Sequence, residues 1–172
     1  MKKIMLCLSL CYCLSSCKGN SSNFQAVTNF DSERYLGKWY EIARFDFRFE
    51  RNLNNTTATY SLNPNGTIKV LNEGYNYVKN KWSKAVGKAK FAENKNVGSL
   101  KVSFFGPFYA DYRVIALDEN YQYALIAGGS TSYMWILSRQ KTIPENIKTQ
   151  YLKIAKDLGF DIDKLIWVEH DK

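Results

Sequence analysis

Cysteine and histidine are scarce in this chain, and their positions exclude several kinds of chemistry. All four cysteines lie within the first 17 residues, and the one histidine is His170, near the carboxyl end. No disulfide can therefore form inside a domain that begins after residue 17, and the spacing assembles no metal-ligand cluster and no Cys/His or Ser/His/Asp set. Glu41 and Asp46 come nearest to a carboxylate pair, but alternation puts them on opposite faces of one strand. We predict a protein that is not an enzyme and has no metal site and no cofactor, and we expect His170 to be a solvated surface residue.

A run of basic residues is lacking as well. The formal net charge is +8, but the lysines and arginines are scattered among acidic and aromatic residues. Nucleic-acid binding normally needs a concentrated basic patch, so the pattern argues against it. A mildly basic surface suits anionic lipid or an anionic small ligand better.

Long hydrophobic runs are absent, with one short exception at the start of the chain. Lys2 and Lys3 precede an apolar run, residues 4–10, that is too short to span a bilayer and has the form of a secretory signal peptide. The run ends in Leu14-Ser15-Ser16-Cys17, which resembles the lipobox of bacterial lipoproteins. The resemblance implies removal of residues 1–16, acylation of Cys17 and, because Lys18 rather than Asp follows, retention at the outer membrane. An ordinary signal peptide with a chance cysteine is the alternative.

The remaining chain divides into a short polar segment and one domain. Residues 17–29 are rich in Ser and Asn and carry no apolar periodicity, so we predict a lipidated flexible tether. Residues 30–172 are long enough for a single domain with one core. Period-2 segments recur there between turn residues, which predicts an antiparallel barrel. The predicted strands are 38–46, 56–62, 67–75, 83–91, 99–105, 109–117, 121–127 and 132–139.

A helix is predicted after the last of these strands. Thr142 and Glu145 have the spacing of a capping box, with Pro144 in the first turn, and Gly159 follows the predicted last residue, Leu158. The apolar residues of this segment fall on one face, which must cover another apolar surface. Residues 165–168 are predicted to form a short closing strand.

The first predicted strand carries the most informative motif, Gly37-Lys38-Trp39-Tyr40-Glu41-Ile42-Ala43-Arg44. It resembles the G-x-W signature of the lipocalins, and the similarity to bacterial outer-membrane members continues through residues 57–62, 102–109, 135–139 and 166–168. The resemblance implies an all-β fold: an eight-stranded antiparallel up-and-down lipocalin barrel with a C-terminal α-helix packed on its outside. It also implies that Arg139 packs over Trp39 beside Gly37 and closes the barrel floor, a structural role. The second family motif is only partly present, because Asp118 matches but its neighbours do not.

Alternation then decides which residues line the barrel, with Trp39 as the inward reference. Small residues on strand 83–91 leave room for one small ligand, which a barrel of this size can hold. The inward polar residues are candidates to orient a ligand head group or simply to bond each other. Strand 121–127 is ambiguous because both of its faces are apolar. The predicted ligand-binding residues are Ala43, Phe45, Tyr60, Val70, Asn72, Gly87, Ala89, Val102, Phe104, Tyr112, Val114 and Trp135, and Glu41 is a further inward polar residue.

The open mouth of the barrel is predicted to be basic. Connections alternate between the two ends of an up-and-down barrel, so Arg48, Arg51 and Lys81 belong to loops at one end, flanked by the phenylalanines at 47, 49, 105 and 108. We predict that these cations hold the anionic head of a lipid whose tail enters the barrel. Ordinary solvated loop charges are the alternative, because salt screens exposed charges beyond about 8 Å.

The resemblance implies a hydrophobic small-molecule ligand: a fatty acid, lysophospholipid or similar membrane lipid, held for storage or transport in envelope maintenance. It implies attachment to the outer membrane through the N-terminal lipid, facing the periplasm. Nucleic acid is not an expected partner, and pairing into a homodimer is left open. Two alternatives remain: a structural or interaction lipoprotein with a packed, ligand-free barrel, and a lipid-modifying enzyme on the same scaffold.

Overall fold

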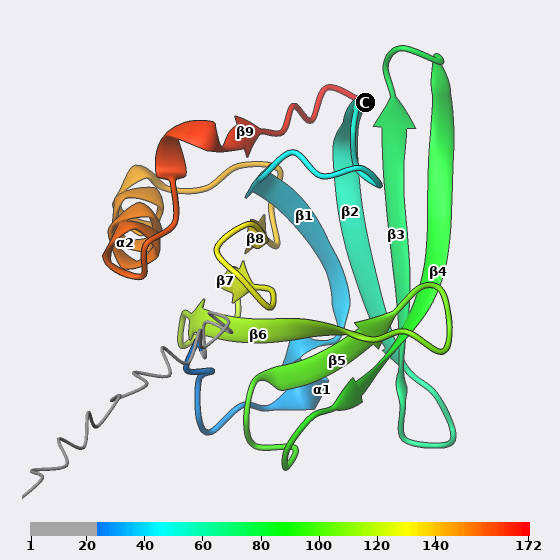
Figure 1. Ribbon diagram of the computed structural model, residues 1–172, viewed down its shortest axis with the longest axis vertical. Coiled ribbons are helices and arrows are strands. Elements are labelled where there is room, and N and C mark those ends of the chain that lie inside the picture. Colours follow the sequence, from blue (N-terminus) through cyan, green and yellow to red (C-terminus); the bar gives the residue numbers. More distant parts are fainter. Residues whose placement is uncertain (1–23) are drawn as a thin grey trace, which may run out of the picture.

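A computed structural model describes residues 24–172 of the protein. The predicted signal peptide and Cys17 lie outside the described residues. Within them, one antiparallel sheet curls into a barrel that is flanked by a single long helix (Figure 1). The strands are β1 (Gly37–Arg44), β2 (Leu53–Leu62), β3 (Ile68–Asn76), β4 (Lys81–Phe91), β5 (Ser99–Ser103), β6 (Ala110–Leu117), β7 (Tyr123–Ala127), β8 (Met134–Ser138) and β9 (Ile166–Trp167).

The barrel closes through its first strand. Each strand from β2 to β8 pairs with the next, β8 pairs with β1, and the lower half of β1 pairs with β2 through Gly37 to Tyr40. The predicted up-and-down barrel is therefore confirmed. Strand bounds differ from the predicted ones by at most three residues: β1 ends at Arg44 rather than at residue 46, and β2 begins earlier, at Leu53.

Helix α2 (Glu145–Asp157) covers one outer face of the barrel. Its buried residues, Tyr151 and Ala155, pack on the outward side chains of β1, β7 and β8, and the Tyr151 hydroxyl donates to the Tyr123 carbonyl at 2.9 Å. Gly159, with φ +86°, ends the helix as predicted. The predicted capping box is wrong, because Pro144 is the N-cap and no side chain bonds the first turn. The Thr142 carbonyl accepts instead from the Ser138 hydroxyl at 2.8 Å.

The amino-terminal residues of the described chain belong to the folded domain. Phe24 is 6% exposed and stacks on Phe160 with ring centroids 4.9 Å apart. The Val27 amide donates to the Val114 carbonyl at 2.9 Å. The short helix α1 (Ser32–Tyr35) follows and leads into β1 beneath the barrel (Figure 1). The tether prediction is therefore wrong for residues 24–29. A single phenylalanine, Phe24, forms no periodic pattern, so apolar periodicity could not indicate that it is buried.

The carboxyl-terminal segment completes the seam between β1 and β2 (Figure 1). Strand β9 pairs with Ala43 and Arg44, where β2 has left β1. The Val168 amide donates to the Ile42 carbonyl at 2.9 Å, and the Asn55 amide donates to the Glu169 carbonyl at 2.8 Å. This segment also holds His170, which is half-buried rather than fully solvated as expected: it lies edge-on to the Tyr40 ring and bonds the Glu41 carbonyl at 2.9 Å.

Candidate functional site in the barrel interior

The floor of the barrel is built on Trp39 and Arg139. The Trp39 side chain is fully buried, and the Arg139 guanidinium carbon lies 3.8 Å from its ring centroid, as predicted. Arg139 also donates to backbone carbonyls of α1, β1 and the β6–β7 turn, including those of Lys38 at 2.9 Å and Leu36 at 2.9 Å. Gly37 has φ +94°, and a Cβ there would lie 3.3 Å from the Arg139 guanidinium, so the position requires glycine.

Above the floor, three tyrosine hydroxyls satisfy one another. The Tyr112 hydroxyl lies 2.6 Å from that of Tyr35 and 2.9 Å from that of Tyr60. Burial raises the pKa of all three hydroxyls, so they are neutral at physiological pH. Of the two predicted roles for inward polar residues, head-group orientation and mutual hydrogen bonding, Tyr60 and Tyr112 therefore show the second. Tyr35 was missed because it precedes the first strand, where alternation has no meaning.

A β-bulge in β1 overturns two predicted ligand residues. The register against β8 shifts between Glu41 and Ala43, so one extra residue sits on β1. A bulge of one residue moves the following side chains to the other face. Ala43 and Phe45, predicted to line the lumen, therefore pack outside the barrel against the α2 side. Arg44, which alternation placed outside, turns inward and is 2% exposed.

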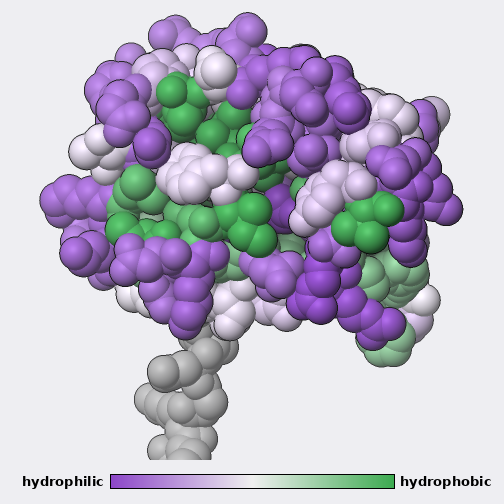
Figure 2. Space-filling model, turned by 90° about the horizontal axis from the view of Figure 1, so that it is seen from above, coloured by the Kyte–Doolittle hydropathy of each residue, from purple (hydrophilic) through white to green (hydrophobic). Residues whose placement is uncertain are grey.

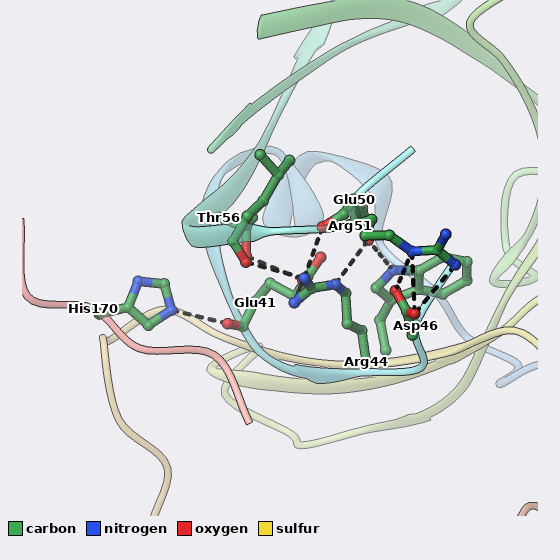
Figure 3. A network of polar contacts seen from close by, with 9 residues as sticks. Glu41, Arg44, Asp46, Glu50, Arg51, Thr56 and His170 are labelled. Atoms are coloured by element: carbon green, nitrogen blue, oxygen red, sulfur yellow. Dashed lines mark hydrogen bonds and ion pairs between the residues drawn. The ribbon is translucent and has the colours of Figure 1, made fainter. Parts of the chain in front are cut away.

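The bulge creates a buried charge cluster near the mouth, made of Glu41, Arg44 and Glu50 (Figure 3). Arg44 Nη1 lies 3.3 Å from Glu41 Oε1, and Arg44 Nε lies 3.7 Å from Glu50 Oε2. The Thr56 hydroxyl donates to Glu41 at 3.0 Å, and the Trp135 indole N–H donates to Glu50 at 3.1 Å. Burial, and secondly the Glu50 charge, raises the pKa of the Glu41 carboxyl well above its ordinary value, and burial likewise raises the pKa of Glu50.

The remaining predicted residues come together on the inner wall. Val70, Ala89 and Val114 are buried in the interior core, and Val102, Phe104, Tyr112 and Trp135 pack against it. The structure also shows which face of β7 is inward, which the sequence left open. Ala124 and Ile126 face the interior, whereas Leu125 and Ala127 face α2.

Toward the mouth, the inner wall is less tightly packed and includes a polar side chain. The Asn72 side-chain oxygen is buried with no hydrogen-bond partner, and Ala85, opposite it on β4, is exposed. Gly87 is not the open space expected, because a Cβ there would meet the Phe104 ring and the Ser103 carbonyl oxygen, each at 2.8 Å. Close packing of the inner wall of β4 therefore reaches up to Gly87, and the inward position beyond it, Ala85, is exposed.

Aromatic side chains gather at the mouth. The Phe47 ring lies edge-on to Trp135 at 5.5 Å, and Phe49 and Phe105 lie 5.5 Å apart while both remain mostly exposed. Figure 2, which views the molecule from above, shows several hydrophobic patches on this face, separated by hydrophilic residues.

The predicted mouth cations differ in their surroundings. Arg51 forms an ion pair with Asp46 at 3.2 Å, and both side chains are exposed. The Arg48 guanidinium lies 5.8 Å from the Phe49 ring centroid, and Lys81 is exposed at the start of β4.

Other features of the described residues lie away from this interior. A surface groove of about 420 Å³ is lined by residues 24–26 and by Thr28, Glu93, Val97 and Arg113, and it includes no predicted ligand residue. Within residues 24–172, no group of three or more His, Cys, Asp or Glu side chains could hold a metal ion. No helix in that part of the chain is long and apolar enough to cross a membrane.

Comparison with known proteins identifies the fold family. The family model of the lipocalin-like domain matches residues 30–170. The chain belongs to the lipocalin family. Within it, the chain is 56% identical over 143 residues to the outer membrane lipoprotein Blc of Citrobacter freundii, covering 83% of this chain and 81% of that protein. It is 45% identical over 167 residues to the Vibrio cholerae protein of the same name, covering 96% of each.

Solved lipocalin structures agree with the architecture. Insecticyanin from the tobacco hornworm, Manduca sexta, superposes with a TM-score of 0.70 at 21% identity, covering 86% of this chain and 84% of insecticyanin. At this identity the likeness concerns the fold alone. Membership of a family of small-molecule carriers and the interior described above together indicate a binding protein.

Proposed function

We propose that this lipocalin binds a fatty acid, lysophospholipid or similar membrane lipid in the upper part of its barrel, for storage or transport in envelope maintenance. The observation that carries the proposal is the contrast within the lumen. Its floor is packed around Trp39 and the three tyrosines, whereas the wall above Gly87 carries small or polar inward residues, Asn72 and Ala85 among them. An acyl chain needs such a space together with apolar walls.

We further propose that the protein is anchored through acylated Cys17 in the outer membrane and faces the periplasm. The support is the lipobox-like sequence at residues 14–17 together with the relatives that carry the name outer membrane lipoprotein. Two acyl signals hold a protein on a membrane far more firmly than one, as expected for a triacylated amino terminus.

The head-group role of Arg48, Arg51 and Lys81 belongs to the same proposal. A cation at the mouth attracts an anionic head through a partly desolvated path. Because Arg51 is ion-paired with Asp46, it should attract an anionic head group less than Arg48 and Lys81 do.

Native mass spectrometry of the full chain purified from its own host tests the binding proposal. We expect a bound species with the mass of an acyl lipid, and uptake of palmitate or lysophosphatidylcholine after delipidation. An empty barrel that takes up neither would favour a structural lipoprotein instead. A bound lipid that is chemically changed on incubation would favour an enzyme. The same spectrum reports whether the protein is a monomer or a homodimer.

A further inference from the structure

The inward turn of Arg44 places a cation where alternation expected none. Arg44 is 2% exposed, and its Nη2 donates to the backbone carbonyls of Glu50 at 2.8 Å and Leu53 at 3.0 Å. Its Nε and Nη1 groups make no hydrogen bond. The two carboxyls beside them, at 3.7 and 3.3 Å, are ion-paired with the guanidinium but out of hydrogen-bond geometry. Buried guanidinium N–H groups normally bond an acceptor, so these two remain available to one.

The carboxyl that faces this guanidinium comes from a loop rather than from the barrel wall. Glu50 lies in residues 45–52, which connect β1 to β2 across the mouth, and its side chain is 14% exposed. The loop rests on the barrel through Phe47 against Trp135, whereas Phe49 is 65% exposed. A segment with few buried side chains can be displaced at small free-energy cost. The Glu50 carboxylate is therefore the most replaceable of the groups around Arg44.

We propose that Arg44 and the Trp135 indole N–H form a binding site for the carboxylate of a long-chain fatty acid inside the barrel, and that Glu50 occupies this site in the unliganded protein. The inference rests on the proposed lipid-binding function and names the head group that the interior recognises. The ligand carboxylate is the same chemical group as the Glu50 side chain, so exchange of one for the other leaves the charge of the cluster unchanged. The Trp135 N–H and the two free guanidinium N–H groups then bond the ligand.

This arrangement differs from head-group capture at the mouth. A carboxylate at Arg44 is bound inside the lumen, so the exposed cations Arg48, Arg51 and Lys81 contribute little to its affinity. A neutral acyl ligand such as hexadecanol brings only a hydroxyl to the Arg44 site and lacks the negative charge that pairs with the guanidinium. A lysophospholipid carries a bulkier phosphodiester, and it separates recognition of phosphate from recognition of a carboxylate.

Equilibrium dialysis tests the inference with radiolabelled palmitate, hexadecanol and lysophosphatidylcholine. It uses the delipidated full chain, which carries Cys17→Ser to keep it out of micelles. Glu50→Gln removes the competing carboxylate but keeps an acceptor for Trp135. We expect palmitate affinity to rise about tenfold, because the neutral amide holds Trp135 and Arg44 more weakly than the carboxylate does and is displaced more easily. Arg44→Gln should lower palmitate affinity about tenfold or more. Trp135→Phe should lower it several-fold, and it keeps the inference testable if Arg44→Gln does not fold. Hexadecanol affinity should change less than twofold in each variant.

Two controls separate the possible outcomes. Trp82→Phe, on the outer face of β4, should leave both ligands unaffected. Reversal of Arg48, Arg51 and Lys81 to Glu should change palmitate affinity less than Arg44→Gln does.

Three outcomes would contradict the proposals in different ways. If palmitate and hexadecanol respond alike to Glu50→Gln and Arg44→Gln, or if reversal of the mouth charges has the larger effect, the inference is wrong while the lipid-binding proposal stands. If lysophosphatidylcholine alone responds, a phosphate rather than a carboxylate is recognised and the inference is again wrong. If the wild type binds none of the ligands, the proposed function itself fails.

Discussion

Arg44 and Ala43 show how one residue decides what a barrel contains. Alternation from Trp39 predicted the inward positions of Tyr60, Val70 and Ala89 correctly, since those strands keep their register. It failed after Glu41, where the bulge inserts one residue into β1. A bulge depends on how β1 meets both β8 and the carboxyl-terminal segment, and no local pattern in the sequence records that. The charge cluster could therefore not be predicted from the sequence.

The Arg139 side chain does more than cover Trp39. It donates to several backbone carbonyls at once, which only a planar guanidinium with five N–H groups can do. Arg139→Lys should therefore lower the free energy of unfolding by about 2–4 kcal/mol, nearly as much as Arg139→Ala. Urea unfolding measures the loss, with the exposed Lys156→Arg as the control. A Lys variant as stable as the wild type would mean that the carbonyl contacts contribute little.

The Glu41 carboxyl should make stability depend on pH in an unusual direction. Because burial raises its pKa, the folded state binds more protons than the unfolded state above the ordinary pKa of 4.5. Stability contributed by this group is present at low pH and is lost as pH rises from 4.5 through the raised pKa, by at most about 1.4 kcal/mol per pH unit. Glu41→Gln should therefore be more stable than the wild type at neutral pH and approach it near pH 4.

Urea unfolding between pH 4 and pH 8 checks this dependence, and the exposed Glu119→Gln is the matched control. Glu50 has a pKa raised for the same reason, so part of the slope should survive in Glu41→Gln. A difference between variant and wild type that stays constant over the whole range would show that the pKa of Glu41 is the same in the folded and unfolded states.

At the scale of elements, β4 divides into two parts with different neighbours. Its lower residues, from Lys88 onward, pair with β5, whereas residues 81–87 pair only with β3. The period-2 pattern predicted the strand and its inward face, but not where its second partner ends. That boundary depends on the length of β5, which stops at Ser103. Small inward residues on one strand therefore do not by themselves indicate free space.

Substitutions along β4 should separate packed wall from open lumen. Gly87→Ala places a Cβ 2.8 Å from the Ser103 carbonyl oxygen and should cost about 1–3 kcal/mol of stability. Ala85→Phe, inward and exposed, should leave stability unchanged but weaken palmitate uptake. Val86→Phe, on the opposite face of the same strand, is the matched control. Equal uptake by the Ala85 and Val86 variants would place the acyl chain elsewhere.

The carboxyl-terminal segment should stabilise the seam through its backbone. Removal of residues 166–172 deletes the β9 pairing and the bonds to Ile42 and Asn55, so we expect the free energy of unfolding to fall by about 3 kcal/mol at roughly 1 kcal/mol per hydrogen bond. Ile166→Thr combined with Trp167→Thr keeps the backbone and removes only half-exposed side chains. Urea unfolding should show a much smaller loss for that pair. Similar losses in both proteins would assign the stabilisation to the side chains.

At the scale of the whole molecule, the barrel itself was predictable and its attachments were less so. Recurrent short alternating segments indicate an antiparallel sandwich or barrel, and the resemblance of the Gly37–Trp39 motif to the lipocalins favours the closed barrel. The helical spacing of apolar residues likewise predicted which face of α2 packs on the barrel. Phe24 and the residues after it depend on contacts with Phe160 and Val114, which are distant in sequence, and so the folded domain begins earlier than composition indicated.

Docking of Phe24 on the barrel sharpens the prediction for the anchor. Residues 17–23 separate the proposed lipid from Phe24, and a chain of seven residues spans at most about 25 Å. An acylated Cys17 would therefore hold the barrel close to the membrane surface, and the acyl chains would supply the affinity. Cys17→Ser should move the protein to the soluble periplasmic fraction or leave it unprocessed, whereas Cys13→Ser should fractionate like the wild type. Membrane fractionation after a high-salt wash distinguishes the two, and a Cys17→Ser protein that stays with the outer membrane would mean that another surface of the molecule anchors it.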